Sequence, residues 1–187
     1  MLDTSDLKKG VKIEIDGAPY LVTEFEFVKP GKGQGLYRCR LRNLLDGSTT
    51  ERTFRSGDKL ESADVSERQL QYLYREGDRY YFMDTETYDQ LFISADQVGD
   101  ARDFLTENLV VAVAFFGNKP IGITLPKFID VVVTRSGAGF KGDTVSNVTK
   151  PVTIETGATI QVPLFIAEGE KIRIDTRTGA YVERVQG

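Results

Sequence analysis

Lys32 is the residue of this chain best placed to do chemistry, because it stands alone on a glycine-rich loop. The segment reads Lys29-Pro30-Gly31-Lys32-Gly33-Gln34-Gly35. Pro30 fixes its own φ and favours an extended Lys29, while the glycines remove bulk around Lys32 and permit left-handed turns. One long cationic side chain on a narrow, bare loop suits insertion into a confined site or approach by a modifying enzyme. The alternative is a solvated turn whose lysine has no function, since glycine and proline commonly only mark turns.

The loop is predicted to join two β-strands, over residues 24–28 and 36–42. By the two-residue period of a strand, the second has one face of Tyr37, Cys39 and Leu41 and an opposite face of Arg38, Arg40 and Arg42. Residues 27–45 contain five basic residues and no acidic one. A row of arginines behind an exposed lysine indicates contact with an RNA phosphate backbone. The alternative is an ordinary solvated strand face.

Composition excludes several kinds of chemistry. The 187 residues include one cysteine, Cys39, and no histidine. A single cysteine excludes an internal disulfide and a cysteine-based zinc site, and the lack of histidine removes the commonest general base and the commonest transition-metal ligand. The pairs Glu24/Glu26 and Asp84/Glu86 could nominally act as acid and base, but no supporting cluster accompanies them. We therefore expect no enzyme activity, no metal and no cofactor.

Charge and hydropathy predict what the protein binds and in which compartment it is found. The net charge is −4, and the whole acidic excess lies in residues 66–128, which hold six basic and ten acidic side chains. An acidic body with a local basic stripe predicts RNA binding at one place only. No signal-peptide pattern and no run of membrane-spanning length is present. We expect a cytoplasmic protein without membrane association.

The elements that must position Lys32 are short strands and turns, which predict an all-β chain of three units. Residues 1–65, with hairpin turns at Asp16-Gly17 and Asp46-Gly47, predict a small SH3-like barrel. Residues 66–128 predict five strands with an inserted helix capped by Ser94, the pattern of an OB-type barrel. Residues 129–187 predict a second OB-type barrel. No long linker separates the three.

Clustered aromatic residues of the central unit allow two interpretations. They are Tyr72, Tyr74, Tyr80, Tyr81 and Phe82. Such rings could form a platform on which RNA bases stack, or they could be core residues and cross-strand pairs. The acidic surroundings favour the core.

Two long motifs make the chain resemble bacterial elongation factor P from end to end. The first is the tip Val28-Lys29-Pro30-Gly31-Lys32-Gly33-Gln34, and the second is the run from Lys150 to Phe165, KPVTIETGATIQVPLF. Val152 stands where the family usually has alanine, which is a small change between two apolar residues of a size that suits a core. Gly142-Asp143-Thr144 and the closing segment 179–184 fit as well. The related two-domain factors of archaea and eukaryotes lack a third domain, and the bacterial paralogue usually lacks the Pro-Gly-Lys-Gly tip.

The resemblance implies a fold, a binding place and an action. It implies a KOW-like, SH3-like barrel and two OB barrels in an L shape similar to tRNA. It implies a monomer that binds both subunits of the ribosome between the peptidyl (P) and exit (E) tRNA sites. Lys32, on a loop shaped by Pro30, Gly31 and Gly33, would then approach the acceptor end of peptidyl-tRNA and relieve stalling at consecutive prolines. In many members this lysine carries a modification, so a lysine-modifying enzyme is a further partner to expect.

The resemblance also assigns roles to residues of the third unit, and the sequence allows two alternative functions. The resemblance assigns Gly142, Asp143 and Thr144 to a loop facing the small subunit and the messenger RNA, and makes Tyr181 and Arg184 candidates for a ribosome contact. One alternative function is a general single-stranded RNA-binding OB protein, which predicts salt-sensitive binding to free RNA. A hydrolase that uses Glu24 or Glu26 is the other.

Overall fold

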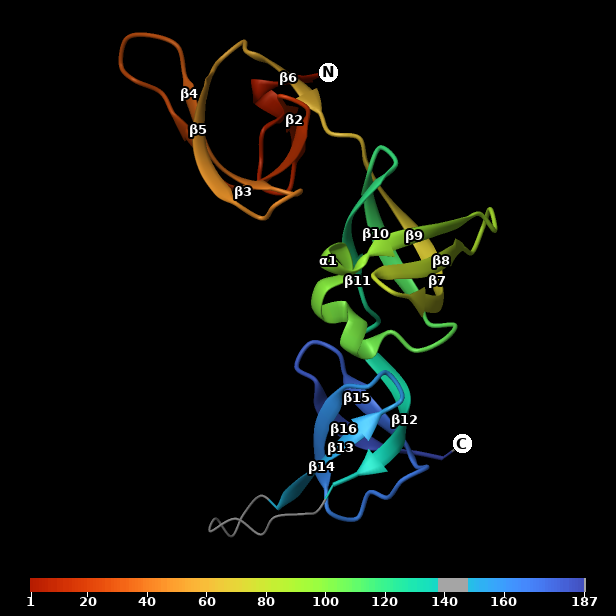
Figure 1. Ribbon diagram of the computed structural model, residues 1–187. Helices are drawn as coiled ribbons and strands as arrows, with labels where there is room; N and C mark the ends of the chain where they lie inside the picture. Colours follow the sequence, from red (N-terminus) through yellow and green to blue (C-terminus); the bar gives the residue numbers. More distant parts are fainter. Residues whose placement is uncertain (138–147, 187) are drawn as a thin grey trace. The chain divides into compact units, whose positions relative to one another are not determined.

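The computed structural model describes residues 1–137 and 148–186. Its strands form three sheets of six, five and five strands (Figure 1). The all-β fold class predicted from the sequence is confirmed. By contacts the chain divides into two compact units, Met1–Glu67 with Ala114–Ile121 and Arg68–Val113 with Gly122–Gly187. Domain boundaries after residues 65 and 128, and the L shape, stay predictions.

The first sheet has the order β1-β6-β2-β3-β4-β5. Its strands are β1 (Leu2–Asp3), β2 (Lys12–Ile15), β3 (Ala18–Val28), β4 (Leu36–Asn43), β5 (Thr49–Arg55) and β6 (Lys59–Ser62), with the short 3-10 helix η1 (Thr4–Asp6) after β1. The β2–β3 turn has φ of 50° at Asp16 and 79° at Gly17. Two successive positive φ values define the type I′ turn that matches strand twist, so the predicted Asp-Gly hairpin is confirmed.

A single hydrophobic core lies inside this first sheet. Its buried members are Leu7, Ile13, Val22, Cys39, Leu41, Phe54 and Leu60. Cys39 and Leu41 come from β4, whose arginines point to solvent, as the two-residue period predicted. The sequence did not predict β1 and β6, which are short and pair with each other at the edge of the sheet.

The central sheet has the order β11-β10-β7-β8-β9. Its strands are β7 (Val65–Glu76), β8 (Arg79–Asp84), β9 (Gln90–Ser94), β10 (Val110–Phe116) and β11 (Lys119–Thr124), and α1 (Ala95–Val98) and η2 (Gly99–Phe104) lie between β9 and β10. The predicted helix cap is present, because Ser94 Oγ accepts a hydrogen bond from the Gln97 backbone N–H at 3.4 Å. Tyr72, Tyr80 and Phe82 are buried. For these three aromatic residues the core interpretation is confirmed.

The third sheet repeats the arrangement of the central one. Its strands are β12 (Phe128–Ser136), β13 (Thr149–Ile154), β14 (Thr159–Pro163), β15 (Lys171–Asp175) and β16 (Ala180–Val185), in the order β14-β13-β12-β15-β16. In each five-stranded sheet the first strand pairs with the second and the fourth, so both have the order 3-2-1-4-5. The third core is aliphatic, with Ile172, Ile174 and Ile166 fully buried.

In the described part of the chain, no helix is long and apolar enough to cross a membrane.

Candidate functional site

The tip loop emerges from a three-stranded ribbon of β3, β4 and β5. β3 pairs with β4 as far as Val28 opposite Leu36, and β5 pairs with the other edge of β4 as far as Arg55 opposite Leu36. Leu36 therefore has a strand on both sides at the very base of the loop. The loop extends beyond the sheet of the first unit (Figure 1). Strand pairing on both sides fixes where the loop begins and ends.

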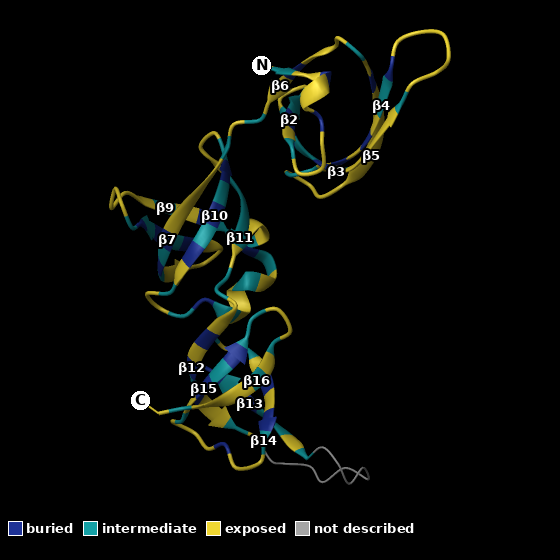
Figure 2. Ribbon diagram, turned by 180° about the vertical axis from the view of Figure 1, so that it is seen from behind, coloured by how far each residue is buried: buried dark blue, intermediate teal, exposed yellow. Residues whose placement is uncertain are grey.

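Residues 29–34, which include Lys32, are all exposed (Figure 2). Gly33 has a φ of +128°, a conformation that L-residues rarely adopt. A Cβ built at Gly31 or at Gly33 would have no heavy atom within 4 Å. The geometry thus has the features predicted for the tip: Lys29, Pro30 and Gln34 flank a bare stretch on which Lys32 carries the cation.

The loop is anchored by a contact that the sequence analysis missed, which we call the loop seat (Phe27, Gly35, Tyr37 and Ser56). A Cβ built at Gly35 would lie 2.5 and 2.7 Å from two ring carbons of Phe27 and 3.1 Å from Ser56 Oγ. Phe27 packs on Tyr37 with ring centroids 4.8 Å apart. The Ser56 backbone N–H donates to the Gly35 carbonyl at 3.0 Å. Only glycine allows the Phe27 ring to lie this close to the backbone at the end of the loop.

The arginine face of β4 is less positive than its own sequence indicates. Arg40 forms ion pairs with Glu24 at 3.4 Å and Glu51 at 3.2 Å. Arg38 lies opposite Glu26 in register, whereas Arg42 lies between Leu21 and Thr49. The window 27–45 contained no carboxylate, but the neighbouring strands supply three. These carboxylates reduce the positive charge of the arginine row, and RNA contact by Arg38, Arg40 and Arg42 stays a prediction.

Cys39 lies on the opposite face of the same strand and is buried. Burial raises the pKa of its thiol, because the low-dielectric core disfavours the thiolate. A protonated, buried thiol is a poor nucleophile. Cys39 is thus a core residue of the ribbon.

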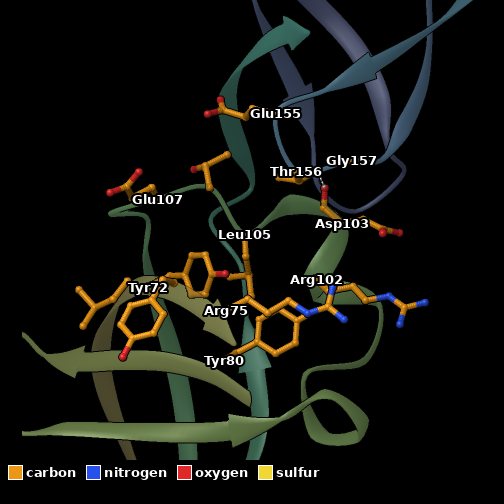
Figure 3. A pocket seen from close by; sticks show the side chains of 13 residues that line it. Tyr72, Arg75, Tyr80, Arg102, Asp103, Leu105, Glu107, Glu155, Thr156 and Gly157 are labelled. Carbon is orange, nitrogen blue, oxygen red and sulfur yellow. Dashed lines mark hydrogen bonds between the residues drawn. The ribbon is translucent and has the colours of Figure 1, made fainter. Parts of the chain in front are cut away.

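The second unit contains a cavity of about 580 Å³ (Figure 3). Its charged lining includes Arg75, Arg102 and Glu107. Arg75 is already engaged, since its Nε donates to the Gly77 carbonyl at 2.8 Å and its guanidinium lies 5.2 Å from the Tyr80 ring centroid. Burial raises the pKa of Tyr72 in the same wall, with the nearby Tyr80 adding to the effect, so its phenol stays neutral. The contacts of Arg75 and Tyr72 in this wall are therefore structural.

The acidic residues considered for catalysis also have structural roles. Asp84 is buried, and its Oδ1 accepts hydrogen bonds from the backbone N–H groups of Glu86 at 2.8 Å and Thr87 at 3.1 Å. These two bonds lower the pKa of Asp84 and close the turn between β8 and β9. Glu24 is in the ion pair with Arg40. Within residues 1–137 and 148–186, no three His, Cys, Asp or Glu side chains gather where they could hold a metal ion.

The site residues predicted in the third sheet are only partly described. Gly142, Asp143 and Thr144 lie outside the described residues. Tyr181 packs against the third core, and desolvation raises its pKa. Arg184 donates to Glu170 Oε1 at 2.8 Å and lies 5.4 Å from the Phe165 ring centroid. Both residues help to complete the sheet, and their ribosome contacts stay predictions.

Family comparisons cover the chain almost completely. The model of the elongation factor P KOW-like domain matches residues 3–60, that of the elongation factor P OB domain matches residues 65–123, and that of the elongation factor P C-terminal domain matches residues 129–184.

Individual relatives agree with the family matches. Elongation factor P of Syntrophus aciditrophicus is 58% identical over 187 residues, and that of Desulfotalea psychrophila is 54% identical over 186, each covering 100% of both chains. Among solved structures, eukaryotic translation initiation factor 5A from Methanococcus jannaschii has a TM-score of 0.57 at 24% identity, over 66% of this chain and 93% of that one. An initiation factor 5A family protein from Naegleria fowleri has a TM-score of 0.55 at 17% identity, over 66% and 96%. These structures are similar in fold.

Proposed function

This chain belongs to the elongation factor P family of translation elongation factors, and we propose that it binds the ribosome between the P and E sites and relieves stalling at consecutive prolines. Full-length matches at 58% and 54% identity support the family. The single observation that carries the finer proposal is the bare, anchored loop that presents Lys32.

The loop acts by positioning and not by proton transfer. Proline is a rigid and poor partner in peptide transfer, so its reacting groups are held badly. Ordering the acceptor end of peptidyl-tRNA would restore a reactive geometry, and correct orientation alone is worth several powers of ten in rate. A slim lysine can enter a narrow site and donate hydrogen bonds to an RNA backbone. A group attached to the lysine would extend its reach and add donors.

The ribbon supports this action from behind the tip. The loop seat fixes the direction in which residues 29–34 leave the sheet. Arg42, which has no carboxylate directly opposite, is the arginine best suited to a phosphate, and Arg38 is the next. Arg40 braces the three strands through Glu24 and Glu51. The partners on this proposal are both ribosomal subunits, the acceptor end of peptidyl-tRNA and a lysine-modifying enzyme, and the protein acts as a cytoplasmic monomer.

Translation of a reporter with three consecutive prolines tests the proposal. Natively produced protein, Lys32→Ala, Lys32→Arg and Lys9→Ala are added to a ribosomal system that lacks the factor. We expect Lys32→Ala to lose at least tenfold in full-length product, because the tip then has no cation and no donor. Lys9→Ala, which removes an exposed lysine of the same unit, should rescue fully.

The remaining outcomes are distinct. Equal rescue by Lys32→Ala and the native protein would move the function away from the tip. Failure of the native protein itself would contradict proline relief and favour the general RNA-binding alternative. Rescue by Lys32→Arg would show that charge suffices without modification. A reporter without prolines should respond equally to all four proteins.

A further inference from the structure

Three aromatic side chains form a row on the outer surface of the central sheet. Tyr74 of β7 lies opposite Tyr81 of β8, which lies opposite Phe92 of β9. The Tyr74 and Tyr81 rings are stacked, with centroids 4.7 Å apart and planes 17° apart. Tyr81 and Phe92 follow at 6.1 Å. The three strands lie side by side in Figure 1, so the row crosses about 10 Å of sheet at the usual strand spacing. We call it the aromatic row.

A shift of register in β7 puts the row outside. The pairing of β7 with β8 slips between Tyr72 and Tyr74, so that Tyr72 is opposite Phe82 while Tyr74 is opposite Tyr81. Tyr72 is 8% exposed and belongs to the core, whereas Tyr74 is 50% exposed. Regular alternation would place both on one face. The extra residue thus separates the aromatic residues into a core group and a surface group.

Cross-strand packing alone does not account for the exposure of the aromatic row. Stacked pairs on a sheet contribute to its stability, but Tyr74 and Phe92 each leave about half of their surface in solvent, at 50% and 49%. Adjacent exposed aromatic rings are a feature of binding surfaces and not of ordinary solvated faces.

The neighbours of the row are suited to a planar, polar ligand. The Arg79 guanidinium lies 4.7 Å from the Phe92 ring centroid, at one edge of the row, and Glu76 lies opposite Arg79 in register. On the other side, Met83 lies between Gln71 and Gln90, so that edge is uncharged. Proteins that bind single-stranded nucleic acid use aromatic faces to stack on bases, guanidinium groups to contact phosphates and amide groups to form hydrogen bonds.

The position of the row in the fold points to the same ligand. β7, β8 and β9 are the first three strands of a five-stranded sheet with a helical segment between its third and fourth strands. This is the OB arrangement, in which the face of the second and third strands binds oligonucleotides. Tyr81 and Phe92 lie on those two strands. A protein partner would need a pocket that receives these projecting rings.

We propose that the aromatic row is a stacking site for one or two unpaired RNA bases, with Arg79 close enough to contact the adjoining phosphate. The site is separate from the tip loop and does not depend on the role of Lys32. Because one or two stacked bases give only modest affinity, we expect a dissociation constant of about a millimolar for free RNA.

Titration of the isotope-labelled full chain with a single-stranded RNA hexamer, followed by NMR, tests the proposal. We expect saturable shifts of the Tyr74, Tyr81 and Phe92 ring signals. The double variant Tyr74→Ser, Phe92→Ser should lose about tenfold in affinity, while its core signals stay in place because both side chains are half exposed. Tyr88→Asn is the matched control, since Tyr88 is 70% exposed and outside the row, and asparagine tolerates its φ of 63°.

Several results would overturn the proposal. Shifts confined to other residues, no shift up to ten millimolar RNA, or equal affinity of the double variant and Tyr88→Asn would each do so. Lys32→Ala should titrate like the native chain, which separates this test from that of the tip. A photo-crosslinking amino acid at position 92, activated on ribosomes, decides between classes of partner. A crosslink to RNA supports the proposal, and a crosslink to protein alone replaces it.

Discussion

Gly35 shows how one residue can control the direction of a functional loop. The Phe27 ring occupies the volume that a Cβ at position 35 would need, at 2.5 Å. The glycine is not needed for its φ, which lies outside the left-handed region. Its role is to allow close approach, and it lies at the boundary between the exposed tip and the ribbon. The loop seat therefore couples residue 35 to the orientation of Lys32.

We predict that Gly35→Ala destabilises the first unit and weakens proline relief. Phe27 is 48% exposed, so its ring can move aside, but it then loses its packing on Tyr37, at a cost of about 1 kcal/mol. We expect the loop to be held less firmly as a result. Urea unfolding measures the first effect, and the triple-proline reporter measures the second. Gly31→Ala is the control, because its Cβ meets open space and its φ is ordinary, so it should change stability by less than about 0.5 kcal/mol. Equal destabilisation by the two alanines would contradict the role of the seat.

At the scale of elements, two irregularities in strand pairing decide which residues face outward. In β3 the register shifts between Val22 and Glu24, and in β7 between Tyr72 and Tyr74. Beyond each shift the two-residue alternation is reversed. The sequence predicted most strands well, because turn residues and alternation are local signals. It could not predict that Tyr72 and Tyr74 face opposite ways, because a bulge depends on the partner strand.

Cross-strand charge is a second property that the local sequence does not contain. Arg40 meets Glu24 and Glu51, which are 16 and 11 residues away along the chain. Local signals therefore predicted the geometry of the loop at Lys32 and its glycines, but not the charges around the β4 arginines, which depend on strand pairing. The loop seat was missed for the same reason, since Phe27 and Ser56 reach Gly35 only in the folded sheet.

The β15–β16 hairpin predicts how the stability of the fold changes at acidic pH. Arg177 lowers the pKa of Asp175 to about 2, mainly through a side-chain hydrogen bond and also through its backbone N–H. Because the folded pKa is below the ordinary value of 3.8, Asp175 stabilises the fold above about pH 4 and loses this contribution as the pH falls towards 2.

NMR titration of the Asp175 carboxyl carbon checks this directly. In Arg177→Ala we expect its pKa to rise towards 3.8. In Asp175→Asn the free energy of unfolding should fall less steeply between pH 4 and pH 2 than in the native chain. An unchanged Asp175 pKa in Arg177→Ala would assign the low value to the backbone hydrogen bond and the charge of Lys127, and not to the Arg177 side chain.

At the scale of the whole molecule, the two compact units carry separate reporters of folding. Cys39 is the one cysteine of the chain and is buried in the first unit. Tyr72 and Tyr80, in the second unit, are buried beside each other with ring centroids 6.1 Å apart. Six of the eight tyrosines lie in the second unit, and two, Tyr20 and Tyr37, lie in the first. Because the chain has no tryptophan, its fluorescence comes from tyrosine and reports mainly on the second unit. Chains with more than one unit commonly unfold in more than one step.

We predict that thiol labelling and tyrosine fluorescence follow different urea transitions. A thiol reagent should react with Cys39 of the native protein at least a hundredfold more slowly than with the unfolded chain, because burial excludes the reagent and raises the thiol pKa. Ile13→Val, in the first core, should shift the labelling transition to lower urea. The major part of the fluorescence change, which comes from the six tyrosines of the second unit, should stay in place. Coincident shifts of both would mean that the units unfold together.

The bareness of residues 29–34 has a consequence for how such a protein can evolve. Every side chain of that stretch is exposed, and the seat that aims it begins one residue later, at Gly35. Substitution or chemical extension at position 32 therefore leaves the packing of the first core unchanged. A lineage can exchange the chemistry of the tip, or acquire a new modifying enzyme, without compensating mutations in the scaffold. Tip and scaffold are inherited together but can diverge independently.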